Sequence, residues 1–178
     1  MLRTAMAAVL VVSLCACRAP DEVAVEAGAA ATAERLPPIA HAADPLAAGQ
    51  LKEGFYGLEE DAWRWTAGRF VVALGIPGGA AGNGAVLSLR FSLPEAVVKR
   101  LGPVTLWASV AGIDLEPQTY TRPGSYLYER RVPAAALAGD TATVKFCTDK
   151  AIPPSETDRR ELALIFISAA LQPAPACD

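Results

Sequence analysis

Three tryptophans carry the clearest potential for binding chemistry in this sequence. Trp63 and Trp65 flank Arg64 in the segment DAWRWTAG, and Trp107 lies apart from them in PVTLWASV. Indole rings stack on the apolar faces of sugar rings, and a guanidinium or a nearby acid can hydrogen-bond the sugar hydroxyls. If residues 63–65 form a strand, both rings share one face and Arg64 points into water from the other. Two interpretations stay open: an exposed aromatic platform, or a core position for at least one ring.

Other aromatic side chains extend this candidate site. Trp107 falls on the polar face of its predicted strand, where either a loop or a helix covers it or the ring is free to stack on a ligand. In SYLYERRV, Tyr126 and Tyr128 share a face and supply amphipathic surface of the same kind. The candidate ligand-binding residues are therefore Trp63, Arg64, Trp65, Trp107, Tyr126 and Tyr128.

Catalytic chemistry has little support in the sequence. The single histidine, His41, precedes the predicted folded domain, which leaves that domain without Ser-His or Cys-His pairs and without a His-containing zinc site. The glycine-rich PGGAAGNG at 77–84 lacks the Lys-Ser/Thr and the following helix that a phosphate-binding loop needs, so it predicts a hairpin. Carboxylates at 59–61 and at Asp158 leave a carboxylate-dependent hydrolase open. We expect no enzymatic activity, no cofactor and no metal site.

Charge excludes one class of partner. The chain has 16 Lys and Arg against 19 Asp and Glu, a net charge of −3, and no basic tract. Nucleic acids and anionic lipid surfaces attract clustered cations. We therefore expect no nucleic-acid partner and no electrostatic attachment to a membrane.

The first residues predict export and a lipid anchor. Residues 1–16 combine a basic start, a short apolar run and a small residue before Cys17, which is typical of a secretory signal and too short for a spanning helix. The segment LCAC at 14–17 resembles the lipobox of bacterial lipoproteins. The resemblance implies cleavage before Cys17, acylation of this cysteine as the first residue, and a membrane as partner. The alternative is an ordinary secretion signal cut after Ala16.

Position 18 bears on the destination. In the enterobacterial pattern an aspartate after the acylated cysteine retains a lipoprotein at the inner membrane, whereas Arg18 stands there in this chain. The resemblance therefore implies a bacterial envelope protein of the outer membrane, facing the periplasm or the cell surface. Residues 17–50 are rich in Ala and Pro and lack aromatic residues, so they predict a flexible tether. The folded domain is predicted at 51–173, followed by a tail at 174–178.

Alternation of apolar and polar residues dominates the predicted domain. Clean period-two segments occur at 70–76, 87–93, 104–110 and 142–146, with further strands at 125–132 and 161–171. LPEAVVKRLG is the one helical signature, and Ala111-Gly112 predicts a tight turn. This pattern predicts an all-β fold, an antiparallel two-sheet β-sandwich of jelly-roll or, alternatively, immunoglobulin-like type with one short connecting helix.

Two cysteines remain once the lipobox is set aside. Cys147 falls on the polar face of its predicted strand, and Cys177 lies next to the last residue. An oxidising envelope lets paired thiols persist, so a Cys147–Cys177 disulfide is predicted. The alternatives are two unpaired thiols, or Cys177 paired with another molecule.

The ordered series FYGLE, WRWT, VVALGIP, LPEAVVKRLGPVTLWASVAG, PGSYLYERRVPAAAL and RRELALIFISAAL resembles small β-sandwich accessory domains of bacterial envelope proteins, some attached to polysaccharide-synthesis proteins. The resemblance implies a non-catalytic, carbohydrate-associated module. The leading hypothesis is a lipid-anchored envelope protein that binds glycan through aromatic and arginine side chains. The alternatives are an assembly lipoprotein that contacts another envelope protein and, less favoured, a hydrolase that uses carboxylates.

Overall fold

Nine antiparallel strands build the part of the chain that the structure, a computed structural model, describes: residues 35–175. The strands are β1 (Ile39–His41), β2 (Leu51–Glu59), β3 (Trp63–Gly75), β4 (Ala85–Leu93), β5 (Val104–Val110), β6 (Ile113–Tyr120), β7 (Gly124–Val132), β8 (Thr141–Thr148) and β9 (Ile165–Pro173). The helices are α1 (Ala80–Asn83) and α2 (Glu95–Leu101), with 3₁₀ turns η1 (Pro45–Gly49) and η2 (Ala134–Ala136). The lipobox, Cys17 and Cys177 lie outside the described residues.

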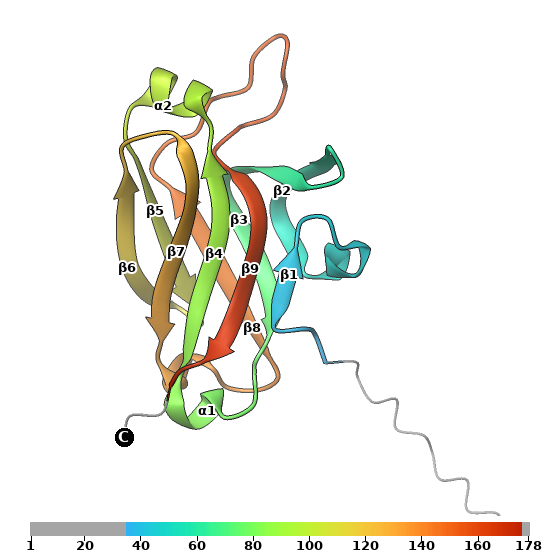
Figure 1. Cartoon of the computed structure of the whole chain (residues 1–178), viewed down its shortest axis with the longest axis vertical. Helices are drawn as coiled ribbons and strands as arrows, with labels where there is room; N and C mark the ends of the chain where they lie inside the picture. The colour runs from blue at the N-terminus through green and yellow to red at the C-terminus, as the bar shows by residue number, and fades with distance from the viewer. Residues whose placement is uncertain (1–34, 176–178) are drawn as a thin grey trace, which may run out of the picture. The chain divides into compact units, whose positions relative to one another are not determined.

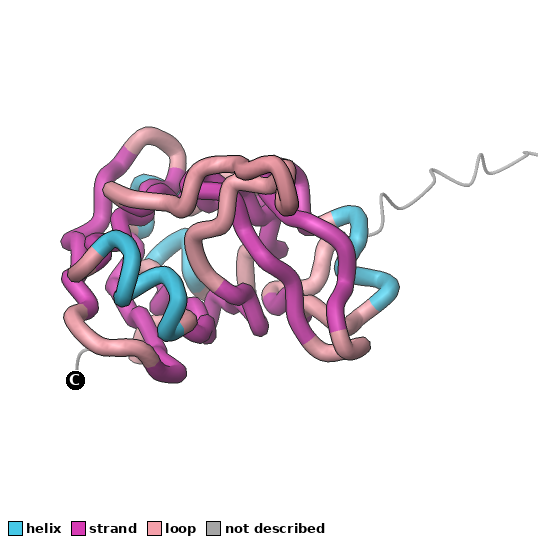
Figure 2. The backbone as a smooth tube through the Cα atoms, turned by 90° about the horizontal axis from the view of Figure 1, so that it is seen from above, coloured by secondary structure: helices cyan, strands magenta, loops and turns pink. Residues whose placement is uncertain are grey.

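The strands form two layers, which are joined where the start of the long strand β3 pairs with β9. The pairing order is β6-β5-β8-β3-β9-β4-β7, with β2 added on β3 and β1 on β9. Residues 69–75 of β3 pair with β8, whereas residues 64–65 pair with β9. One layer therefore holds β6, β5, β8, β3 and β2, and the other holds β7, β4, β9 and β1 (Figure 1). The view from above shows the strands gathered around a common interior (Figure 2). The predicted all-β antiparallel sandwich is confirmed.

Period-two alternation builds the core. Successive side chains of a strand point to opposite faces, so an apolar residue at every second position gives each layer one apolar face. The faces meet between the layers, where Phe70 and Phe146 stack with ring centroids 4.9 Å apart. The fully buried large side chains are Phe70, Leu74, Leu87, Leu89, Phe91, Leu93, Leu106, Tyr128, Leu137, Phe146, Leu164 and Phe166.

Side chains also bridge the two outermost strands of the pairing order, β6 and β7. The Tyr128 hydroxyl donates to the Glu116 carbonyl at 2.9 Å, and Arg130 Nε donates to the same oxygen at 2.7 Å. The Arg130 guanidinium lies 4.5 Å from the centre of the Tyr128 ring. Tyr128 is thus a fully buried core residue, and its assignment to a ligand-binding surface is wrong. Its hydroxyl has a carbonyl partner on β6, which lets a tyrosine be buried.

The segments that connect the strands include the predicted turn at Ala111-Gly112, the predicted helix and the predicted hairpin at 77–84. Ala111 and Gly112 have positive φ angles of 50° and 80° and join β5 to β6, as a two-residue type I′ hairpin turn requires. The helix α2 is also confirmed, with Val97 buried against the core. The hairpin predicted at 77–84 is wrong. This segment contains α1 and crosses from β3 to β4, which lie in different layers and do not pair.

The described chain before residue 51 belongs to the sandwich. Strand β1 pairs with β9, and Ala40, Ala42 and Ala47 are almost fully buried. Gly75 permits the close approach of this segment, because a Cβ atom there would lie 1.8 Å from the Leu36 carbonyl oxygen.

Residues 36–50, which were predicted to belong to the tether, are therefore part of the domain, and the predicted boundary at residue 50 lies too far along the chain. Alanines, which give a weak hydrophobic signal in the sequence, fit between closely spaced backbones. His41, assigned to the tether, is an exposed residue of β1. Within residues 35–175, none of the helices combines the length and apolar character needed to span a membrane.

Candidate binding groove

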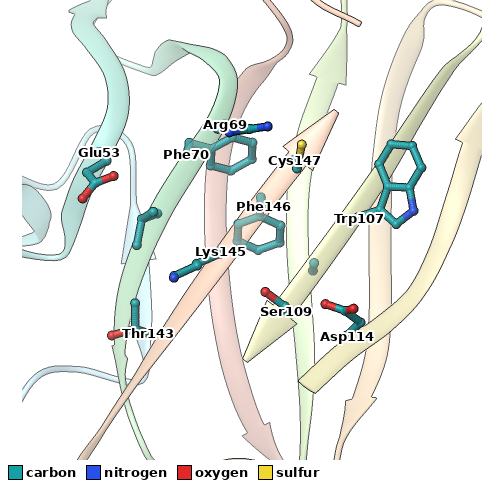
Figure 3. Close-up of a pocket in the computed structure, with 12 residues that line it drawn as sticks. Glu53, Arg69, Phe70, Trp107, Ser109, Asp114, Thr143, Lys145, Phe146 and Cys147 are labelled. Carbon is teal, nitrogen blue, oxygen red and sulfur yellow. The ribbon is translucent and has the colours of Figure 1, made fainter. Parts of the chain in front are cut away.

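The outer face of β3, β8 and β5 carries a groove of about 500 Å³ (Figure 3). Its floor is β8, whose outward side chains include Lys145 and Cys147. The floor is central because β8 pairs with β3 on one side and with β5 on the other. Strands β2 and β6 form the margins, through Glu53 and Asp114.

Strand register arranges the groove residues in two rows across the strands. The first row runs Arg69, Cys147, Trp107 over β3, β8 and β5. Neighbouring strands lie about 4.8 Å apart, so the guanidinium-bearing and indole-bearing positions are about 10 Å apart. A stacking ring and a strong hydrogen-bond donor therefore stand on opposite sides of the Cys147 thiol.

The second row is longer and almost entirely polar. It runs Glu53, Val71, Lys145, Ser109, Asp114 over five strands, from β2 to β6. Four strand spacings make this row about 19 Å wide. The face thus presents donors and acceptors over an area larger than a single sugar ring.

Trp107 is the exposed aromatic residue of this groove. Its neighbours Leu106 and Ala108 point inward and are buried, whereas Trp107 points outward and keeps 38% of its surface exposed. The sequence left two outcomes for this ring, covered or free, and the structure keeps it exposed in the groove lining. It stands on the opposite side of Cys147 from Arg69 (Figure 3). The alternation in PVTLWASV was the signal that placed it outward.

The charged groove residues make no ion pairs within residues 35–175. No salt bridge and no side-chain hydrogen bond in that range involves Glu53, Arg69, Lys145 or Asp114. All four side chains are exposed. Their hydrogen-bonding capacity is therefore available to a ligand.

The segment 63–65 does not join this groove. Trp63 and Trp65 are half-buried and meet edge to face with centroids 6.3 Å apart, and Trp65 packs against the core. Arg64 donates from Nε to the Ala42 carbonyl and from Nη1 to the Tyr56 carbonyl, both at 3.1 Å. The expectation that Arg64 holds its charge in water is thus wrong. The guanidinium satisfies backbone carbonyls of two neighbouring segments.

Tyr126 also faces inward. Its ring packs on Phe91 and Tyr120, and its hydroxyl donates to the Arg122 carbonyl at 2.8 Å. Of the six predicted ligand residues, only Trp107 lies in the groove. Sequence reasoning missed the charged groove residues, because exposed polar residues on different strands carry no sign of which ones become neighbours.

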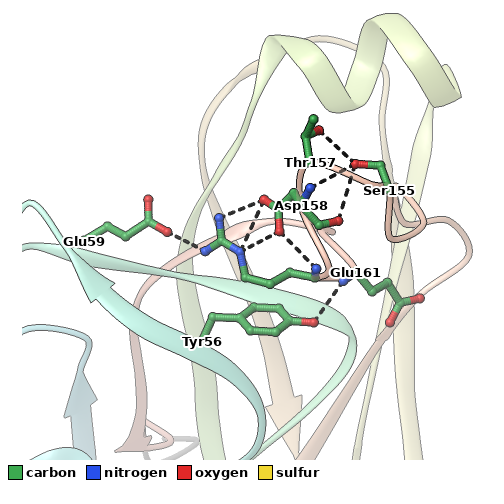
Figure 4. Close-up of polar contacts among 7 residues, drawn as sticks. Tyr56, Glu59, Ser155, Thr157, Asp158 and Glu161 are labelled. Atoms are coloured by element: carbon green, nitrogen blue, oxygen red, sulfur yellow. Dashed lines mark hydrogen bonds and ion pairs between the residues drawn. The ribbon is translucent and has the colours of Figure 1, made fainter.

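Two of the carboxylates considered for hydrolysis are held by one arginine (Figure 4). Arg160 bonds both oxygens of Asp158 and donates to Glu59 at 2.6 Å, above the ring of Tyr56. The hydrogen bond from the Arg160 side chain lowers the pKa of Asp158. A general acid needs the opposite shift. The cluster instead fastens the loop before β9 to β2, helped by the bond from the Glu161 amide to the Tyr56 hydroxyl.

Metal-binding geometry is lacking in the same range. Among residues 35–175, no group of three or more His, Cys, Asp or Glu side chains is placed to hold a metal ion. Cys147 has no sulfur partner there, and its predicted partner Cys177 lies outside the described residues.

No protein-family model and no curated protein matches the chain. Among solved structures, it is similar to the carbohydrate-binding module CBM36 in complex with calcium and xylotriose, at 9% identity and TM-score 0.40 over 75% of this chain and 98% of that one. The CBM36-1 domain of a multidomain xylanase from the hindgut metagenome of Trinervitermes trinervoides gives 11% identity and TM-score 0.42, over 78% and 98%. A CBM4 structure gives 12% and 0.37, over 76% and 85%. At this distance the likeness bears on neither ligand nor activity.

Proposed function

We propose that this chain binds carbohydrate in the groove on β3, β8 and β5, without catalysing a reaction. The observation that carries the proposal is the uncovered Trp107 ring beside charged side chains that have no partner among the described residues. Sugars require this combination, because one face of the ring is apolar while its edge carries hydroxyl groups.

Energetics favour a ligand at Trp107. An exposed indole on a strand costs hydration free energy of about 25 cal/mol for each Å² of apolar surface left in water. The core does not need this ring, since residues at alternate positions of β5 already fill the interior. A bound sugar face would remove the indole from water, and the row from Glu53 to Asp114 would hydrogen-bond hydroxyls on its edge.

We propose further that the domain works at a bacterial envelope, anchored through lipid on Cys17 and facing the periplasm or the outer surface. The LCAC segment supports this part of the proposal. An anchored domain needs no high intrinsic affinity, because attachment confines it near envelope glycans and raises their effective concentration.

The test measures binding of the chain from Arg18 onward to an array of bacterial envelope glycans. Trp107→Ala should weaken binding about tenfold or more, since a lost stacking contact is worth about 1.4 kcal/mol or above. The matched control is Leu127→Ala, which removes a side chain of similar exposure from the other layer and should leave binding unchanged. Unchanged binding in a folded Trp107→Ala variant would exclude the groove. No binding by the wild type would shift the assignment to a protein partner.

A further inference from the structure

We infer that the groove selects an acidic glycan, whose anionic groups sit on Arg69 and Lys145 while the chain lies along β8. This inference rests on the proposed function and specifies its ligand class. It follows from the distribution of charge over the groove and from the direction in which the groove continues.

Positive charge occupies the centre of the groove. Arg69 lies opposite Cys147, and Lys145 is two residues from Cys147 on the same face of β8. This diagonal relationship places their Cα atoms about 7–8 Å apart. No carboxylate among residues 35–175 lies within 4.0 Å of either cation. Two neighbouring like charges without an acidic partner repel each other, and an anionic ligand would relieve that repulsion.

Negative charge is confined to the margins. Glu53 and Asp114 lie in the same row as Lys145, each two strands away from it and so about 10 Å distant. Glu53 is also a diagonal neighbour of Arg69, with Cα atoms about 7–8 Å apart, but the two side chains form no salt bridge. A polyanion laid across the strands would bring its acidic groups onto these carboxylates. A polyanion laid along β8 avoids them and passes both cations.

The groove continues in that second direction. A hollow lined by Arg69, Cys147 and Lys150 adjoins it at one end, and a hollow lined by Lys145, Thr143 and Thr141 adjoins it at the other. The first hollow also holds two carboxylates, but both have partners in the chain: Asp149 pairs with Lys150 and accepts from the Thr105 amide, and Glu161 accepts from the Gly68 amide. From Thr141 to Thr148, β8 advances about 24 Å at 3.4 Å per residue. This length accommodates an oligosaccharide of several units, with one sugar on the Trp107 ring and an acidic group at Arg69 about 10 Å away.

Figure 3 shows the same arrangement. Arg69, Cys147 and Lys145 occupy the middle strands, Trp107 stands on the far side of Cys147, and Glu53 and Asp114 border the groove. A carboxylate is the simplest anion that matches the planar fork of Arg69, and sulfate or phosphate esters share the same charge.

The experiment compares ligands of one length that differ only in charge. Uronic-acid oligosaccharides should bind the chain from Arg18 onward at least tenfold more tightly than their methyl esters, which keep the same backbone but are neutral. Sulfated oligosaccharides form a third arm and separate a carboxylate requirement from a general anion requirement. The preference should decline as salt rises from 0.05 to 0.5 M, since the charges are exposed.

Variants connect the preference to the two cations. Arg69→Gln and Lys145→Gln should each reduce the preference for the acid over its ester, and together they should abolish it along with its salt dependence. The matched control, Lys52→Gln, removes an exposed charge of β2 outside the groove and should change nothing.

The outcomes separate this inference from the proposed function. Equal, Trp107-dependent binding of acid and ester by the wild type would overturn the acidic preference and leave carbohydrate binding intact. Acid preference that survives in the double variant would move the anion site elsewhere. Absence of binding to every glycan would overturn both.

Discussion

Replacing Gln50 by methionine tests whether the segment before residue 51 is part of the domain. Gln50 is 1% exposed, and its side-chain nitrogen donates to the Pro37 carbonyl at 2.9 Å and to the Ala73 carbonyl at 3.1 Å. Methionine has nearly the same shape but donates no hydrogen bond. The substitution therefore removes two bonds of about 1 kcal/mol each. It takes a donor from the Ala73 carbonyl in a buried position, whereas the Pro37 carbonyl keeps the Gly75 amide as a donor. We expect the free energy of unfolding to fall by about 2–3 kcal/mol.

Thermal and urea unfolding, followed by tryptophan fluorescence, measure this loss. For a domain of this size, 1 kcal/mol corresponds to about 3–5 °C, so the Tm should fall by about 6–15 °C. The urea midpoint should fall at an unchanged slope, because the surface exposed on unfolding stays the same. Gln172→Met makes the same chemical change at an exposed position of β9 and serves as the control. A Gln50→Met variant within 0.5 kcal/mol of that control would refute the docking of residues 36–50.

Two further predictions concern titratable groups. The buried Tyr120 hydroxyl has no hydrogen-bond partner among the described residues, and burial raises its pKa to about 12. Between pH 10 and 12 the folded state therefore retains the hydroxyl proton, whereas the unfolded state loses it. Stability should therefore fall as the pH rises from 10 to 12, and Tyr120→Phe should remove about 2 kcal/mol of that decline in urea unfolding at pH 8 and 11.5. The second prediction concerns Cys147, which lies about 20 Å along β8 from Thr141. The described chain stops at Pro175, at the same end of the sandwich as Thr141 (Figure 1). The two residues from Pro175 to Cys177 and a disulfide span at most about 14 Å, which is too short to reach Cys147. Iodoacetamide should therefore alkylate the Cys147 thiol without reductant. If the thiol is alkylated only after reductant is added, the Cys147–Cys177 disulfide is favoured instead.

The sandwich was predictable because period two is a direct consequence of strand geometry. In 87–93 and 104–110 each inward position is apolar, so pairing and burial follow from the pattern alone. The segment 36–50 was not predictable in this way. Its alanines are buried by the backbone of their neighbours, and the deciding feature, the absence of a Cβ atom at Gly75, lies far away in sequence.

Strand β7 shows where alternation becomes ambiguous. Tyr126 and Tyr128 alternate with Leu127, and the apolar residue is the one that points out, 42% exposed. The deciding factor is the edge of β6, whose Glu116 carbonyl accepts hydrogen bonds from both Tyr128 and Arg130. A tyrosine can be buried when its hydroxyl has a partner, and the sequence of β7 gives no sign that β6 provides one.

Trp107 is the one predicted ligand residue that lies in the groove, and the other arginines and aromatics are used by the fold itself. Arg64, Arg130 and Arg160 donate to carbonyls or carboxylates of the chain itself, and these bonds tie segments together. Such side chains are already satisfied and have little left to offer a ligand. The Arg69 side chain, by contrast, makes no hydrogen bond or ion pair within residues 35–175, and Arg69 stands two strands from the exposed ring. The residue types are the same in both groups, so the sequence does not separate structural arginines from Arg69. The register of β3, β8 and β5 distinguishes Arg69, because it places this side chain across Cys147 from Trp107.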